Sequence, residues 1–302
     1  MAGYIHEFFG YRAEDKTDVA LNAVRDERCP FIQERCNKTF SDGTVSGVCS
    51  IRQVTSADAV ICCPIRLYAD DYQILKMIAD RAFSPGLPLV EGKSAIAYTQ
   101  SRRQKCVAVF GKGWGGELRL PQKSGKGGYF VDWVLALLDE NGDLLEFTAI
   151  EVQTIDTTGN YRNGFTALKA NRTLDRSTVG LNWENVSKRI LPQLIYKGQV
   201  LQREELCRKG LFFVCPRPVF DRIVGRLGGT QSLLRYTFQP AAITFIAYDY
   251  APDSVLVDSI ATPLAEVGSL TTTVYKVQEA FNNVALPDEN VYKTAILQAL
   301  GK

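Results

Sequence analysis

Histidine is nearly absent from this sequence, which contains His6 alone among 302 residues. A Ser-His-Asp hydrolase needs an imidazole as the base beside its nucleophile, and hydrolases of the HNH or phospholipase-D type need more than one histidine. The chain also lacks a G-x-x-x-x-G-K-[ST] loop. The segment KSGKGG at 123–128 resembles such a loop only in composition and predicts a basic loop. These absences argue against histidine-dependent hydrolysis and against an ATP-driven motor.

Long hydrophobic runs are missing as well. No window of about 18 apolar residues exists, so no transmembrane helix is predicted. The start, MAGYIHEFFGYRAEDK, lacks a basic region followed by an apolar run, so we read no signal peptide. With 46% hydrophobic and 23% charged residues, the composition is that of a globular protein with one large domain, or with a core and a smaller module. The expected compartment is the cytoplasm.

Positive charge is concentrated in two windows, although the net charge is only +2. From Arg102 to Lys126, seven basic residues stand against one acid, Glu117, and from Asn160 to Lys197 seven stand against two. These windows flank the segment 130–156. They fit a phosphate-binding cleft, and they fit a solvated mixed surface equally well.

The segment FVDWVLALLDENGDLLEFTAIEVQTID, at 130–156, consists of two apolar runs joined by Asn141-Gly142. Asn-Gly between such runs predicts a β-hairpin with a two-residue type I′ turn. Continuing the ladder from this turn without a bulge places Asp132 opposite Glu151. Facing Cβ atoms in an antiparallel pair lie about 4.5–5.5 Å apart. Gln153 falls on the same face as Glu151, because side chains alternate along a strand.

Two carboxylates that face each other in an apolar setting repel, so a cation should lie between them. A divalent metal is the simplest candidate, and Mg²⁺ favours one or two carboxylates together with waters and substrate phosphates. The other interpretation is that Asp132 faces solvent at a sheet edge, or that a bulge shifts the register.

Asp132 and the triplet Glu151-Val152-Gln153 resemble the signature of the PD-(D/E)xK nucleases, with Gln153 where that superfamily usually has lysine. Together with GWGGELRLP at 113–121, YFVDWVLAL at 129–137 and IEVQTID at 150–156, they resemble the NotI type of restriction endonuclease, which shares the E-x-Q variant. The resemblance extends from about Cys29 to Lys197.

The resemblance implies a type II restriction endonuclease that hydrolyses phosphodiester bonds of duplex DNA at a GC-rich palindrome such as CGGCCG. It also implies a homodimer, a companion DNA methyltransferase in the host, and Mg²⁺ held by Asp132 and Glu151. Gln153 can orient a water molecule or a phosphate oxygen, but it carries no positive charge. Glu117 is a further candidate for the metal, or it pairs with Arg119.

Five of the eight cysteines lie near the N-terminus, and disulfides are not expected in a cytoplasmic chain. The spacing C-x6-C-x12-C-x13-C predicts a structural metal site of Cys29, Cys36, Cys49 and Cys63, with Cys62 as the alternative to Cys63. Zn²⁺ and Fe fit four thiolates equally well, and the resemblance favours iron. The other interpretation is a set of small buried hydrophobic side chains. The remaining cysteines, Cys106, Cys207 and Cys215, are predicted to be core residues.

The expected fold class is α/β, with a mixed central sheet flanked by helices and a small N-terminal four-cysteine subdomain. We assign 1–95 to the metal-binding region and 96–302 to the nuclease core with C-terminal helices. Strands are predicted at 105–110, 210–216 and 241–250, helices at 70–83 and 218–228, an amphipathic stretch at 184–198, and two polar helices within 270–300.

Arginines that follow the second strand of the hairpin are candidates for reading bases, since a guanidinium fork pairs with the O6 and N7 atoms of guanine. These are Arg162, Arg172 and Arg176, while Lys188 and Arg189 on a predicted helix fit phosphate contacts. Alternatives that remain open are a DNA repair or structure-specific nuclease, a non-catalytic DNA-binding module, and an enzyme acting on another substrate.

Overall fold

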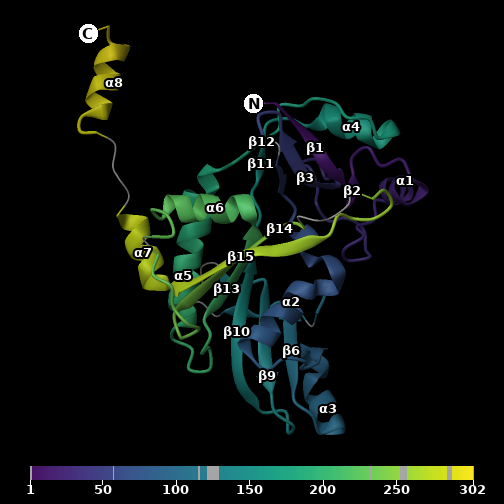
Figure 1. Cartoon of the computed structure of the whole chain (residues 1–302), viewed down its shortest axis with the longest axis vertical. Helices are drawn as coiled ribbons and strands as arrows, with labels where there is room; N and C mark the ends of the chain where they lie inside the picture. Colours follow the sequence, from purple (N-terminus) through teal and green to yellow (C-terminus); the bar gives the residue numbers. More distant parts are fainter. Residues whose placement is uncertain are drawn as a thin grey trace.

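The computed structural model describes residues 2–56, 58–114, 116–120, 129–231, 233–251, 257–283 and 288–301. Within this part of the chain, two larger β-sheets are surrounded by helices (Figure 1). No helix among these residues has the length and apolar character needed to cross a bilayer.

The central sheet has seven strands and mixed direction. Its strand order is β15 (Leu264–Thr273), β14 (Ala242–Tyr250), β13 (Leu211–Pro216), β10 (Leu144–Val152), β9 (Trp133–Leu138), β6 (Cys106–Gly111) and β5 (Leu89–Glu91). The three strands β14, β13 and β10 are parallel to one another, and β9 pairs antiparallel with both β10 and β6. Every residue of β13 is buried, as expected for a strand covered on both faces.

Helices cover both faces of this sheet. On one face α2 (Ala69–Ala82) packs on Ile150 and Val152 of β10. The apolar side chains of α5 (Leu191–Leu201), α6 (Arg217–Arg226) and α7 (Val274–Asn282) belong to the core that contains Ala149 of the same strand, on the opposite face. Because side chains alternate, Glu151 points to the α5 side. At the far edge, α3 (Gly92–Arg102) packs on β6 and β9.

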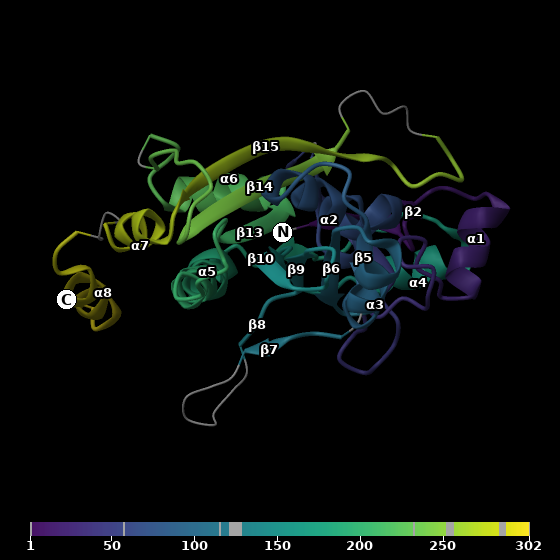
Figure 2. The same cartoon turned by 90° about the horizontal axis from the view of Figure 1, so that it is seen from below.

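The second sheet lies at the N-terminus and was not predicted from the sequence. Its four antiparallel strands are β2 (Tyr11–Arg12), β1 (Gly3–Phe8), β3 (Val48–Gln53) and β4 (Ala59–Ile61). The remaining elements are α1 (Asp18–Arg25), η1 (Pro64–Tyr68), β7 (Arg119–Leu120), β8 (Tyr129–Phe130), β11 (Thr157–Thr158), α4 (Arg162–Asn171), β12 (Gly180–Leu181), η2 (Val186–Ile190) and α8 (Val291–Ala299). Figure 2 shows β7 and β8 projecting from the body of the molecule.

A buried polar cluster at Glu7 joins the two sheets. Arg66 Nη2 lies 3.0 Å from Glu7 Oε1, and both side chains are almost completely inaccessible to solvent. The hydroxyl of Tyr250, at the end of β14, donates to Glu7 Oε2 at 2.8 Å. Because Glu7 lies on β1 and Tyr250 in the central sheet, the hydrogen bond between them fixes the N-terminal sheet against the core.

The predicted α/β class with a mixed central sheet flanked by helices is confirmed, and the predicted helix at 70–83 corresponds to α2. The predicted strands correspond to β6, β13 and β14. Within 270–300 the first residues continue β15, and two helices, α7 and α8, follow. The domain boundary at 95 stays a prediction, although that residue lies within α3, and β5 before it already belongs to the central sheet.

The hairpin turn differs from the prediction. Asp139 N donates to Asp143 O, so the loop has three residues, Glu140 to Gly142, and only Gly142 has positive φ, at 93°. A register shift between Leu144 and Glu146 follows. The longer loop and the shift compensate, so from Glu146 onward the ladder has the predicted register and Ile150 pairs with Trp133.

This turn makes Gly142 the residue that its backbone requires. An alanine at this position would have to adopt positive φ, and its Cβ would lie 3.1 Å from Ile96 Cγ2. Gly142→Ala should therefore destabilise the protein by about 1–3 kcal/mol. Asn141 is exposed and has ordinary φ, so Asn141→Ala should cost less than about 0.5 kcal/mol. Urea unfolding of both variants measures these costs. Equal losses of stability at the two positions would contradict this turn and support the predicted type I′ turn.

Candidate functional site

The predicted carboxylate pair comes together where β9 begins and β10 ends. The ladder runs to Trp133 opposite Ile150, and one further step brings Asp132 beside Glu151. Asp132 Oδ2 accepts a hydrogen bond from the backbone N–H of Val152 at 2.7 Å. Glu151 is only 7% exposed. The structure thus places both acids at one end of two adjacent strands in the middle of the central sheet.

The two carboxylates are shifted toward their protonated forms. Burial, and then the charge of Asp132, raise the pKa of Glu151 from its ordinary value of 4.5 to about 7. Burial also raises the pKa of Asp132, against the opposing effects of the Val152 N–H and of Lys197. Desolvation disfavours the charged form of both residues, and at Glu151 the charge of Asp132 adds to this effect. Such a pair is stabilised as two anions when cations approach it.

One cation is already present, and the sequence analysis missed it. Lys197 Nζ lies 2.6 Å from Glu151 Oε1, and the two side chains are 12% and 9% exposed. Glu151 Oε2, in contrast, is buried without a hydrogen-bond partner among the described residues. A signal for Lys197 existed, since it lies three residues after Leu194 and four before Leu201, both buried on α5.

Gln153 and Glu117 lie near the same end of the sheet. Gln153 N donates to Val214 O, which continues the pairing of β10 with β13, and the side-chain amide of Gln153 donates to Thr154 O at 3.4 Å. Glu117 is exposed, and its charge is among the influences that raise the pKa of Asp132. The acid is therefore within electrostatic range of the pair. The side chain of Arg119, its alternative partner, lies outside the described part of the structure.

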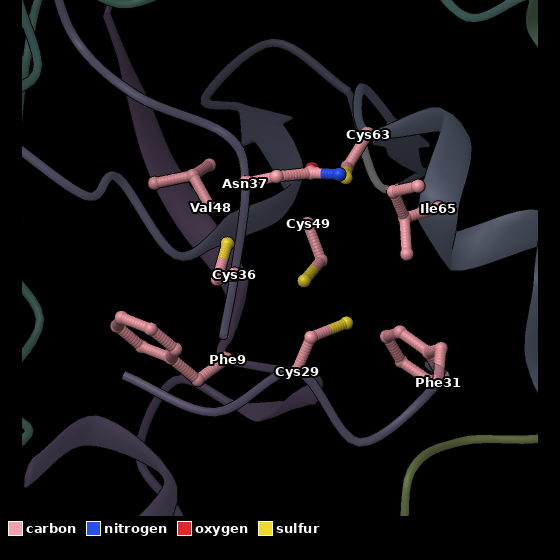
Figure 3. A pocket seen from close by; sticks show the side chains of 9 residues that line it. All are labelled: Phe9, Cys29, Phe31, Cys36, Asn37, Val48, Cys49, Cys63 and Ile65. Carbon is pink, nitrogen blue, oxygen red and sulfur yellow. The ribbon is translucent and has the colours of Figure 1, made fainter. Parts of the chain in front are cut away.

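The four cysteines predicted as metal ligands line a single small cavity. Cys29, Cys36, Cys49 and Cys63 surround it together with Asn37 and apolar side chains (Figure 3), and its volume is about 10 Å³, comparable to one water-sized sphere. Cys62 does not line this cavity, and its thiol contacts Lys38 Nζ at 3.3 Å. Burial raises the pKa of the Cys29 thiol, places that of Cys49 well above its ordinary value, and raises the pKa of Cys63 to about 12.

The structure does not itself show a metal site. Among the described residues, no three or more histidine, cysteine, aspartate or glutamate side chains are arranged so that they could hold a metal ion. The four thiols lie around one space without forming a closed coordination cage. All eight cysteines are free, and Cys106, Cys207 and Cys215 are buried core residues, as predicted.

Arg172 is not available for DNA, which corrects its assignment as a base reader. Its side chain is 1% exposed, and its guanidinium donates to the backbone carbonyls of Ala20, Phe8 and Arg12. These bonds join α1, β1 and β2. The residue follows α4 directly and has a structural role, because its two Nη atoms bind backbone carbonyls of three other elements.

The other predicted DNA contacts lie on the surface, each with a partner. Arg162 pairs with Asp42 at 2.6 Å and stacks on Phe40, while Arg176 Nε donates to Tyr4 OH at 2.8 Å. Lys188 pairs with Glu184, and Arg189 with Asp156 at 3.1 Å. Exposed ion pairs are weak, so phosphates can displace the acids that pair with Arg162, Lys188 and Arg189.

Among the basic residues of the two windows that the structure describes, only Lys188 of the second window contributes to a wide surface groove. Lys123 and Lys126 of the first window lie outside the described residues. The groove, of about 1310 Å³, runs between η2 and α6, and four basic and four acidic side chains line it. Its charges balance, so it lacks the positive excess of a DNA-binding surface.

The shifted pKa of Glu151 gives the site a pH signature. Between about pH 4.5 and 7 the folded metal-free protein holds more protons at Glu151 than the unfolded chain does, so its stability falls as the pH rises. Glu151→Gln carries no charge at this position, so its stability relative to the wild type should rise across this window, by about 1–3 kcal/mol at the upper end.

Urea unfolding in EDTA at a series of pH values measures this difference. Glu140→Gln, exposed at the hairpin tip, is the control and should follow the wild type. A difference between wild type and Glu151→Gln that stays constant across the window would contradict the buried, shifted carboxylate.

Comparison with known protein families identifies the family of this chain. The model of the restriction endonuclease NotI family matches residues 16–231, which include both carboxylates, Gln153, Lys197 and the four cysteines. Comparison with curated proteins gave no significant match. Because the family match covers more than half of the 302 residues, this chain belongs to the NotI restriction endonuclease family and is a site-specific deoxyribonuclease.

Proposed function

We propose that this enzyme is a Mg²⁺-dependent type II restriction endonuclease of the PD-(D/E)xK type, which cuts duplex DNA at a GC-rich, CGGCCG-like palindrome. The observation that carries the proposal is that Asp132, just before β9, lies beside the buried Glu151 of β10, with Glu151 Oε2 unpartnered among the described residues. A buried carboxylate oxygen without a partner is costly unless a ligand completes it.

The donor set fits Mg²⁺, which takes oxygen ligands from one or two carboxylates and fills its other positions with water and phosphate. When bound, such a metal acts as a Lewis acid on the scissile phosphate and makes a nearby water more acidic. Asp132 and Glu151 would hold it, and the Val152 N–H keeps Asp132 in place. Glu117 is exposed, and its charge acts on Asp132, so it is a candidate for an additional metal ligand through a water molecule.

The reaction is hydrolysis. The water oxygen forms a bond to phosphorus as the bond from phosphorus to the 3′ oxygen breaks, which leaves a 5′-phosphate and a 3′-hydroxyl. The water loses one proton to solvent and the 3′ oxygen gains one. The Gln153 amide can orient the water or a phosphate oxygen, although it neither carries positive charge nor acts as a base.

We also propose that Cys29, Cys36, Cys49 and Cys63 hold one structural metal ion, with Fe favoured by the family resemblance and Zn²⁺ as the alternative. Their convergence on a cavity the size of one small sphere supports this proposal. Four thiolates would close the coordination shell, so the ion would stabilise the fold and take no part in hydrolysis.

For DNA recognition, Arg162 and Arg176 remain our candidates for base contacts, and Lys188 and Arg189 for phosphate contacts. All four side chains reach solvent. A homodimer would present two copies of this surface to a palindrome, since a two-fold protein matches a two-fold site. A companion methyltransferase would protect the host DNA in the cytoplasm.

Removal of either carboxylate tests the active site. Asp132→Ala or Glu151→Ala should lower cleavage at least about a thousandfold, because each loses a ligand of the metal. Binding to duplex DNA should persist. Supercoiled plasmid with Mg²⁺ should give discrete bands with the wild type and with Glu140→Ala, the control. A smear would favour a structure-specific nuclease, and near wild-type cleavage by either variant would rule out this site.

The cysteine cluster is tested by the metal content. Cys36→Ser should lose the bound ion and lower the melting temperature, because binding energy at a structural site is folding energy. Cys62→Ser is the matched control and should keep the ion, since Cys62 does not line the cavity. Elemental analysis measures both variants. Less than about half an equivalent of Fe or Zn in the wild type would count against a closed site.

A further inference from the structure

We propose that Lys197 supplies the positive charge that Gln153 cannot supply, and that its ammonium faces the scissile phosphate beside Glu151. This inference rests on the proposed function of the Asp132–Glu151 pair. It assigns a role in cleavage to a residue of α5, far along the chain from the E-x-Q triplet.

The contact between Lys197 and Glu151 is unlike the surface ion pairs of this protein. The two side chains are 12% and 9% exposed. In the other ion pairs of the described residues, except that of Glu7 and Arg66, each side chain is at least a fifth exposed. A buried lysine loses its hydration, and replacing such a pair with apolar residues is often neutral or stabilising. Stability alone therefore gives little reason for a lysine at this position.

The packing of α5 determines where the ammonium lies. Lys197 shares the buried face of the helix with Leu194 and Leu201. Gly198, the next residue, lies against α7, and a Cβ there would come within 2.9 Å of Val274 Cγ2. The missing side chain lets α5 approach its neighbours closely. The backbone that carries Lys197 is thus fixed against the core, and the side chain extends from it to Glu151.

The ammonium has a chemical task at this position. It binds only one oxygen of Glu151, and the other oxygen remains for a metal. An ammonium is a compact point charge with three donors, so it can hold a carboxylate and a phosphate oxygen at once. Charge placed in advance where negative charge develops in the transition state lowers the barrier. Gln153, a neutral amide, cannot do this.

The central test compares Lys197→Met with Lys276→Met. Lys276 on α7 pairs with Glu279 at 2.7 Å at the surface and has no part in the proposed machinery, so the control removes the same group from the same kind of partner. In single-turnover assays with saturating DNA and Mg²⁺, Lys197→Met should cleave at least about a hundredfold more slowly, and the control should match the wild type. Gln153→Lys in the Lys197→Met background returns the charge to the strand and should recover at least about tenfold over Lys197→Met.

Binding gives a second readout that does not depend on cleavage. Without metal, Lys197→Met presents two carboxylates and no ammonium to the phosphate, so its affinity for duplex should fall about fivefold or more relative to Lys276→Met. Ca²⁺, used as a non-catalytic ion, should reduce this gap to within about threefold, because it restores positive charge at the pair. A purely structural lysine would lower the melting temperature without a metal-dependent difference in binding.

The outcomes are separable. If Lys197→Met cleaves within about threefold of the wild type while Asp132→Ala is inactive, this inference fails and the proposed function stands. If the wild type cuts no duplex with Mg²⁺, the proposed function itself fails. If Lys197→Met does not fold, Lys197→Gln carries the same comparison, because its amide can still donate to Glu151 without charge. Wild-type cleavage by Lys197→Gln would overturn the inference.

Discussion

Two carboxylates held together at the end of the central sheet are the constraint on which the site depends. Asp132 directly precedes β9 and Glu151 lies on the adjacent β10. Burial raises the pKa of both, the charge of Asp132 further raises that of Glu151, and one oxygen of Glu151 has no partner among the described residues. Ionisable side chains with strongly shifted pKa values are concentrated at functional sites, because apolar residues would fill such a position at lower cost. Positive charge makes the pair more favourable: Lys197 supplies one such charge, and the metal ion that we propose would supply more.

The rest of the fold positions that pair. The ladder between β9 and β10 brings the two acids together, and parallel pairing of β10 with β13 buries Glu151 in the middle of the sheet. On one face, α5 delivers Lys197. The N-terminal sheet is fixed to the core by the buried Glu7–Arg66 pair and Tyr250, so the cysteine cavity keeps a defined position relative to the central sheet. In our proposal the cysteines stabilise the scaffold and the carboxylates take part in the chemistry.

Sequence reasoning reached the carboxylate pair through local rules, since alternation and hairpin geometry fix which residues face each other. It did so although the turn was wrong, because the extra loop residue and the register shift near Leu145 cancel. It could not find Lys197, because which helix covers Glu151 depends on contacts between segments far apart in the chain. Arg172 shows the same limit. Its charge suggested DNA, and only the tertiary structure shows that three backbone carbonyls bind it.

A crystal structure of the enzyme with a cognate duplex and Ca²⁺ tests the central claim most directly. We expect a metal ion within about 2.3–2.6 Å of carboxylate oxygens of both Asp132 and Glu151. The scissile phosphate should complete its coordination, and Lys197 Nζ should lie within hydrogen-bond distance of a phosphate oxygen. A complex in which the scissile phosphate lies elsewhere, with neither acid bound to metal, would contradict this account.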